Sequence, residues 1–213
     1  MLTIKEFEKK YNVRFCFDHA GKMSGMVSLS TSVKANPYCK AHCQVNGSIC
    51  QKCYANTMFE YYKTMNDKYL NNTIALTENI IPVKDWPIIN AAYIRLEAFG
   101  DLNNETQVIN YFNLCKANKH AKIALWTKNP HLIDNVIKSG YKKPSNLVII
   151  VSSLFINKVA CYKNYSFIDK IFTVYDKETA KTVNINCSAR NCLTCNRCYH
   201  KTRDIEYINE LLK

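Results

Sequence analysis

Two compact groups of cysteines constrain this chain more than any other feature of its sequence. The first lies within residues 39–53 and the second within residues 187–198, and together they hold eight of the eleven cysteines. The members are Cys39, Cys43, Cys50, Cys53, Cys187, Cys192, Cys195 and Cys198. Four thiols close together in sequence match the ligand set of one tetrahedral metal ion or one cubic iron–sulfur cluster. The chain must therefore fold so that each group can gather around a common centre.

The spacing within the groups favours iron–sulfur clusters over zinc. It is C-x3-C-x6-C-x2-C in the first group and C-x4-C-x2-C-x2-C in the second. Zinc ribbons usually pair two C-x2-C knuckles across a longer insert, and neither group does so. The C-x2-C-x2-C run at the end of the second group is typical of cluster-binding ferredoxins, with Cys187 left to act as the fourth ligand. We expect [4Fe-4S] clusters, with zinc, thiols shared between the groups, or ligation by His42 or His200 as alternatives.

The remaining composition indicates a folded protein in a reducing compartment. Hydrophobic residues make up 47% of the 213 residues, with only 5 Gly and 5 Pro, which is typical of a globular chain. Residues 1–15 carry mixed charge without an apolar stretch, and no apolar run is long enough for a transmembrane helix. We therefore predict a cytoplasmic protein without membrane association, in which cysteines bind metal rather than form disulfides.

The net charge of +12 suggests an anionic partner such as nucleic acid. The lysines are scattered, however, and none of them forms a dense block. General compositional bias explains the charge equally well, so nucleic-acid binding remains an alternative rather than the main prediction.

Strand and helix patterns alternate along most of the chain. The predicted strands are residues 26–30, 91–101, 122–130, 147–151, 171–175 and 183–187. The predicted helices are residues 1–15, residues 54–76, segments capped by Asn103 or Asn104 and by Asn129, and a last one carrying Ile205, Ile208, Leu211 and Leu212. The run 147–151 is apolar throughout, as in strands that are buried on both faces of a parallel sheet.

This alternation predicts an α/β fold with a parallel sheet. About six strands are too few for a closed eight-stranded barrel. We therefore predict one domain over residues 1–213, a partial β/α barrel of about six mostly parallel strands with outer helices. An open doubly wound sheet is the alternative.

In either architecture the active face lies at the carboxyl ends of the strands. Both cysteine groups follow predicted strands. Four charged candidates for catalysis lie on the predicted strands or in the polar segments at their carboxyl ends: Arg95, Glu97, Asp101 and Lys128. Arg95 and Glu97 are two apart on one strand, so both side chains are expected on the interior face, either as a structural ion pair or as functional groups. Lys128 is a candidate for binding an anionic ligand.

Four segments resemble the phage "gene product 88" family: GSICQKCYA at 47–55, RLEAFGDL at 95–102, ALWTKN at 124–129 and CLTCNRCY at 192–199. The resemblance covers about residues 24–199. It implies a phage origin, hence the host-cell cytoplasm, and an iron–sulfur site, but it names no reaction.

A more distant similarity is to radical S-adenosylmethionine enzymes, which place a cluster loop after the first strand of a partial α/β barrel. Cys39 and Cys43 match the first pair of the C-x3-C-x2-C loop of those enzymes, whereas the third cysteine is displaced to Cys50. The segment from Glu97 to Asp101 is a loose counterpart of their acidic strand motif. The similarity implies S-adenosylmethionine as a conceivable cofactor.

Three functions follow from these patterns. The main prediction is an iron–sulfur protein that acts as a redox or radical-type enzyme on a small molecule, with its site at the carboxyl rim of the barrel. A non-enzymatic redox or sensor protein with fully ligated clusters and a protein redox partner is the second. A zinc-stapled nucleic-acid-binding protein is the third.

Overall fold

The computed structural model describes residues 1–162 and 164–212 and confirms the predicted α/β architecture. In this described part, six strands form one sheet in which all neighbours are parallel and the spatial order follows the chain. The strands are β1 Val27–Leu29, β2 Tyr93–Leu96, β3 Lys122–Thr127, β4 Leu147–Ser152, β5 Lys170–Tyr175 and β6 Glu206–Leu211. Because β1 and β6 do not pair with each other within the described residues, the sheet is a partial barrel.

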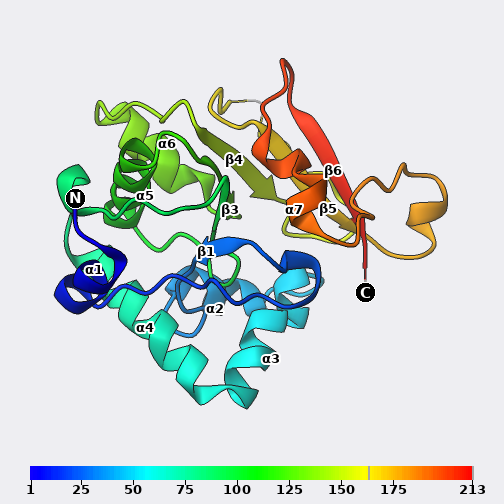
Figure 1. The fold of residues 1–213 in the computed structure, drawn as a ribbon. Helices are drawn as coiled ribbons and strands as arrows, with labels where there is room; N and C mark the ends of the chain where they lie inside the picture. Colours follow the sequence, from blue (N-terminus) through cyan, green and yellow to red (C-terminus); the bar gives the residue numbers. More distant parts are fainter. Residues whose placement is uncertain (163, 213) are drawn as a thin grey trace.

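The helices in the described ranges are α1 Ile4–Tyr11, α2 Pro37–Cys43, α3 Tyr54–Tyr61, α4 Lys63–Glu78, α5 Glu105–Ala117, α6 Pro130–Lys138 and α7 Cys192–Cys195. Figure 1 shows α5 and α6 together on one side of the strands, and α7 near β5 and β6 on the other side. No helix within residues 1–162 and 164–212 is long and apolar enough to cross a membrane.

Strand alternation divides the sheet residues between two cores. On the outer face, Ile123 and Leu125 of β3 pack with Val108 and Phe112 of α5 in the main core, where all four are fully buried. On the inner face, a second core contains Met26, Ala124, Val148, Ile150 and Tyr199, with Tyr93, Trp126 and Phe172 packed against it. The inner face is therefore covered by the segment that carries the second cysteine group.

Three predicted elements differ from the structure. The C-terminal segment is strand β6 rather than a helix, because its backbone pairs with β5 from Lys170 through Tyr175. The predicted strand 183–187 is not a strand. Part of it lies against β6 instead, where the amides of Asn186 and Cys187 both donate to the carbonyl oxygen of Asn209.

The predicted helix 54–76 is two helices, α3 and α4, which meet at Tyr62. Tyr62 has a non-helical backbone, with φ −118° and ψ 84°. The break separates the cysteine-proximal α3 from the longer α4, which packs on α5 through the fully buried Leu76.

Candidate metal centre and cavity

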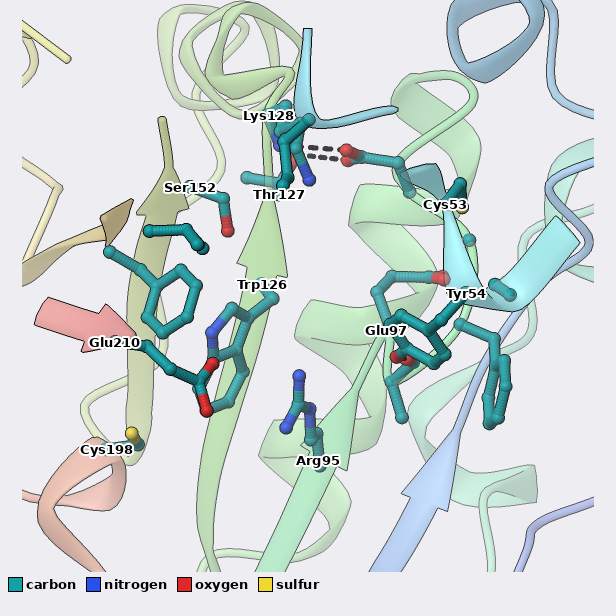
Figure 2. Close-up of a pocket in the computed structure, with 18 of the residues that line it drawn as sticks. Cys53, Tyr54, Arg95, Glu97, Trp126, Thr127, Lys128, Ser152, Cys198 and Glu210 are labelled. Atoms are coloured by element: carbon teal, nitrogen blue, oxygen red, sulfur yellow. Dashed lines mark hydrogen bonds between the residues drawn. The ribbon is translucent and has the colours of Figure 1, made fainter. Parts of the chain in front are cut away.

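One cavity of about 530 Å³ brings together the grouped cysteines and the charged residues that were predicted from the sequence as site residues. Its lining includes the eight grouped cysteines together with Arg95, Glu97, Asp101 and Lys128. Figure 2 shows the cavity, with Cys53 and Lys128 at one end and Cys198 and Arg95 at the other. The two cysteine groups therefore border the same space from opposite ends.

The first cysteine group is carried by the loop that follows β1. Its helix α2 begins at Asn36, whose side-chain oxygen accepts from the amides of Tyr38 (2.9 Å) and Cys39 (3.3 Å). The amide nitrogen of Asn36 donates to the carbonyl oxygens of Asp101 (2.8 Å) and Leu102 (3.2 Å). Asn36 is fully buried, so it ties this loop to the carboxyl end of β2.

Further contacts hold the first group at the rim. The hydroxyl of Tyr38 donates to the carbonyl oxygen of Lys128 (2.6 Å). The backbone amide of Ile49 donates to the carbonyl oxygen of Leu154 (2.9 Å). The ring of His42 lies 3.9 Å from that of Tyr38, and its Nδ1 contacts the Tyr38 carbonyl oxygen (2.8 Å). This group therefore occupies the carboxyl rim, as predicted from its place after the first strand.

The second cysteine group lies in the connection between β5 and β6 and extends across the inner face. Tyr199, which follows Cys198, is 3% exposed and packs in the inner core. His200 contacts Lys122 at the start of β3, with its Nδ1 3.0 Å from the lysine ammonium, and does not line the cavity. The prediction that a strand ending at Cys187 places this whole group on the carboxyl rim is therefore wrong, because the group runs toward the amino ends of the strands.

The thiols form two separate neighbourhoods. Burial raises the pKa of Cys198, and the nearby Cys187, Cys192 and Cys195 raise it further, while Arg95 lowers it. In the first group, burial and the neighbours Cys53 and Cys50 raise the pKa of Cys43. Each of these thiols is thus influenced by cysteines of its own group, which favours one centre per group over a mixed site.

The donor set fits thiolate-bound metal in number and in kind. All cysteines in the described ranges are free thiols, and each group supplies a full set of four soft ligands. Within residues 1–162 and 164–212, no three His, Cys, Asp or Glu side chains are placed to hold one metal ion. The fit is therefore in the number and kind of donors, and it applies to zinc as well as to an iron–sulfur cluster.

Glu97 does not face Arg95 across the interior. It has a left-handed backbone (φ 54°), and its carboxylate accepts from Thr31 (3.0 Å), from Gln107 Nε2 (2.7 Å) and from the hydroxyl of Tyr111. Burial raises the pKa of Glu97 to about 8, although the hydrogen bonds from Tyr111 and Thr31 lower it. The ion pair that the strand spacing allowed is absent from the described residues, because the left-handed turn directs Glu97 toward β1 and α5.

Gly100 makes this turn fit. Its φ is +81°, and a Cβ atom there would lie 2.5 Å from the carbonyl oxygen of Thr31 and 2.7 Å from a carboxylate oxygen of Glu97. The Gly-Asp step of the sequence therefore serves the close packing of this loop against β1.

The carboxylate of Asp101 is also engaged in hydrogen bonds within the protein. Its carboxylate accepts from the hydroxyl of Thr127 (2.5 Å) and from the backbone amides of Lys128 (2.9 Å) and Leu102 (2.7 Å). Burial raises its pKa, while the Lys128 ammonium and these donors lower it. Glu97 and Asp101 thus line the cavity as structural supports whose acceptor oxygens are already used.

The two cationic candidates, Lys128 and Arg95, both interact electrostatically with thiols. Burial lowers the pKa of Lys128, but Asp101, Cys50 and Cys39 raise it, and its net shift is upward. Arg95 lowers the pKa of Cys192 and Cys198. Each cysteine group thus has a cation beside it, which suits the negative charge of four metal-bound thiolates.

Several residues on the cavity walls were not predicted from the sequence. The Trp126 ring lies 4.0 Å from the Arg95 guanidinium carbon. Lys22 contacts the thiol of Cys187 (3.2 Å) and the carboxylate of Glu210 (2.9 Å). Strand alternation at 124–129 could have placed Trp126 on the inner face with Ala124, whereas no sequence signal connects Lys22 to Cys187.

Comparisons with protein families, with curated proteins and with solved structures give no match to this chain. The function of this protein must therefore be inferred from the residues of the cavity.

Proposed function

We propose that this protein binds two iron–sulfur clusters, one in each cysteine group, and that it acts as a redox or radical-type enzyme on a small molecule held between them. One observation carries the proposal: eight thiols from two distant loops border a single cavity in two sets of four. Bound clusters would supply one-electron transfer. The likeness to the "gene product 88" family supports the same reading and suggests a phage protein.

The chain's own residues have definable parts in this proposal. Lys128 and Arg95 offset the negative charge of the thiolates at the two ends of the cavity. Trp126 and Phe172 give the cavity an apolar wall that keeps water away from a bound molecule. Glu97 has no role as a cofactor ligand, since Thr31, Gln107 and Tyr111 already use its oxygens, and the proposal therefore gives S-adenosylmethionine no part.

A redox carrier is the second candidate, and the ligand count favours it. Eight thiols complete the coordination of two four-iron clusters and leave no iron open to a substrate. The cavity favours the enzyme over the carrier, because a redox carrier does not need a space of about 530 Å³ between its two clusters.

The test is a metal analysis of protein purified without oxygen. We expect about eight irons and about eight sulfides per chain, with the broad visible absorption of [4Fe-4S] clusters. The double variants Cys50→Ser/Cys53→Ser and Cys192→Ser/Cys195→Ser should each lose about half of the iron. Cys161→Ser, at an exposed cysteine outside both groups, is the matched control and should keep all of it.

Zinc without sulfide or colour would refute the cluster proposal. It would favour the zinc-stapled nucleic-acid-binding protein, whose binding to DNA or RNA should then weaken steeply with salt.

A further inference from the structure

We infer that the cavity binds a small carboxylic acid with a flat, apolar body, and that Arg95 recognises its carboxylate. The inference rests on the proposed function, because it names the substrate class of the same cavity. Its evidence is the hydrogen-bonding state of the charged groups on the cavity wall.

Arg95 is a cation whose donors are largely unused. It forms no ion pair within the described residues, and its Nε is buried without a hydrogen-bond partner. Its one described hydrogen bond is a weak contact from Nη1 to the sulfur of Met23 (3.3 Å). A buried guanidinium donor without a partner is costly, and the planar fork matches a carboxylate in two-point geometry.

Trp126 holds this guanidinium in place. The arginine carbon lies 4.0 Å from the centre of the indole ring, so the two planar groups are in contact on the cavity wall. Figure 2 shows the Arg95 side chain standing beside the Trp126 ring, between the labelled Glu97 and Glu210. A fixed fork loses little freedom when a ligand arrives, which is what an anchor for a small anion requires.

The walls around Arg95 define the body of the ligand. Trp126, Phe172, Val174 and Phe99 line the cavity, and Ser152 adds a hydroxyl. A volume of about 530 Å³ lies within the range of small-molecule sites. Aromatic and aliphatic walls with one charged anchor suit a flat apolar molecule that carries a single anionic group.

Charge favours a carboxylate over a phosphate. The carboxylate of Glu210 also lines the cavity, and both cysteine groups become anionic when they bind metal. A dianionic phosphate would meet more repulsion there than a singly charged carboxylate. Lys22 is already paired with Glu210, and Arg197 with Glu206. Among the described residues of this end of the cavity, Arg95 is therefore the cation with unused donors.

The experiment measures probe binding by calorimetry under argon, with the full-length protein as purified. Cinnamate is the flat carboxylate, cinnamamide its neutral analogue, and phenyl phosphate the dianionic probe. We expect wild type to bind cinnamate about 10- to 100-fold more tightly than cinnamamide, as for hydrogen bonds to a charged group. Arg95→Met should abolish this preference while leaving cinnamamide binding unchanged.

Two further variants make the result specific. Arg95→Lys keeps the charge but loses the fork, so it should lose most of the preference if Arg95 recognises the carboxylate. Arg203→Met, at an exposed arginine outside the cavity, should bind all probes like wild type. Iron and sulfide are measured on every sample, which separates loss of a cluster from loss of an anchor.

Three outcomes would overturn the inference. They are equal binding of cinnamate and cinnamamide by wild type, an unchanged preference in Arg95→Met or Arg95→Lys, and tighter Arg95-dependent binding of phenyl phosphate than of cinnamate. An iron-loaded protein that does not discriminate the probes refutes this inference alone. A zinc protein that binds cinnamate through Arg95 refutes the cluster proposal alone.

Discussion

Each cysteine group includes a short helix that is capped by an asparagine, Asn36 at the start of α2 and Asn191 at the start of α7. Asn36 is fully buried and bonds to the backbone after β2, whereas Asn191 is half-buried and reaches only the carbonyl oxygen of Ser24 (3.1 Å). The first group is therefore fixed by hydrogen bonds to the sheet rim. The second is held by backbone hydrogen bonds from Asn186 and Cys187 to Asn209 of β6 at its start, and by the packing of Tyr199 on the inner face at its end.

Similar cysteine motifs within this one protein are therefore positioned by different combinations of contacts. Directional hydrogen bonds fix the angle of the first loop relative to β2 and β3. The apolar packing of Tyr199 fixes the end of the second segment less directionally. Each mode of attachment should fail under a different substitution.

The largest effect is expected at the packing contact. Tyr199→Ala removes a buried ring from the inner core and should lower the unfolding free energy by about 3 to 5 kcal/mol. It should also reduce metal retention in the second group, because Cys198 is the adjacent residue. Urea titration under argon, with iron analysis, measures both effects. Tyr199→Phe keeps the ring and is the control; a similar loss in that variant would contradict the packing explanation.

A smaller effect is expected at the hydrogen-bonded contact. Asn36→Ala removes four hydrogen bonds and leaves buried backbone groups without partners, so it should cost about 2 to 4 kcal/mol. The same change at the half-buried Asn191 should cost about 1 kcal/mol. The urea midpoints of the two variants test the comparison directly. Equal losses would show that both loops are held in the same way.

The effect that is smallest per step of the experiment, one pH unit, concerns the turn that supports the first group. Glu97 has a pKa of about 8 in the folded chain against an ordinary value of 4.5, so the folded state keeps a proton that the unfolded state releases. Stability should therefore fall as pH rises from about 4.5 to about 8, by about 1 kcal/mol per pH unit. The neighbouring Asp101, whose pKa is also raised by burial, adds a slope of the same sign.

Glu97→Gln should flatten this pH dependence, and urea titrations at several pH values measure it. Glu178→Gln, at an exposed carboxylate, should keep the slope of wild type. Stability that rises with pH in wild type would show that the donors from Thr31, Gln107 and Tyr111 outweigh the effect of burial.

The sequence predicted the middle of the fold well because the signals there are local. The apolar run 147–151 and the predicted strand 122–130 correspond to β4 and β3. Asn104 caps α5 as expected, whereas Asn129 precedes α6 without a capping hydrogen bond from its side chain. The C-terminal segment was misassigned because Ile205, Ile208 and Leu211 fit a helical stripe. Pairing with the open edge of β5 decides its conformation, and that is a non-local interaction.

The sequence predicted which residues lie at the candidate site, but not how their side chains are oriented. Residue spacing placed the cysteines and the four charged residues near one another, and they line one cavity. The spacing could not show that Glu97 turns away from Arg95, because a left-handed residue after a strand breaks the two-residue alternation. The sequence also could not show that Arg95 has unused donors, because this depends on which residues the fold places around its guanidinium group.

The strand order has a consequence for how the protein is made. Because β1 to β6 pair in the order of the chain, each strand emerging from the ribosome can join one that is already synthesised. The first cysteine loop and the strands up to β5 are complete before the second loop and β6 emerge. The cavity thus has an open side until the second cysteine loop and β6 have emerged, and these segments complete its lining.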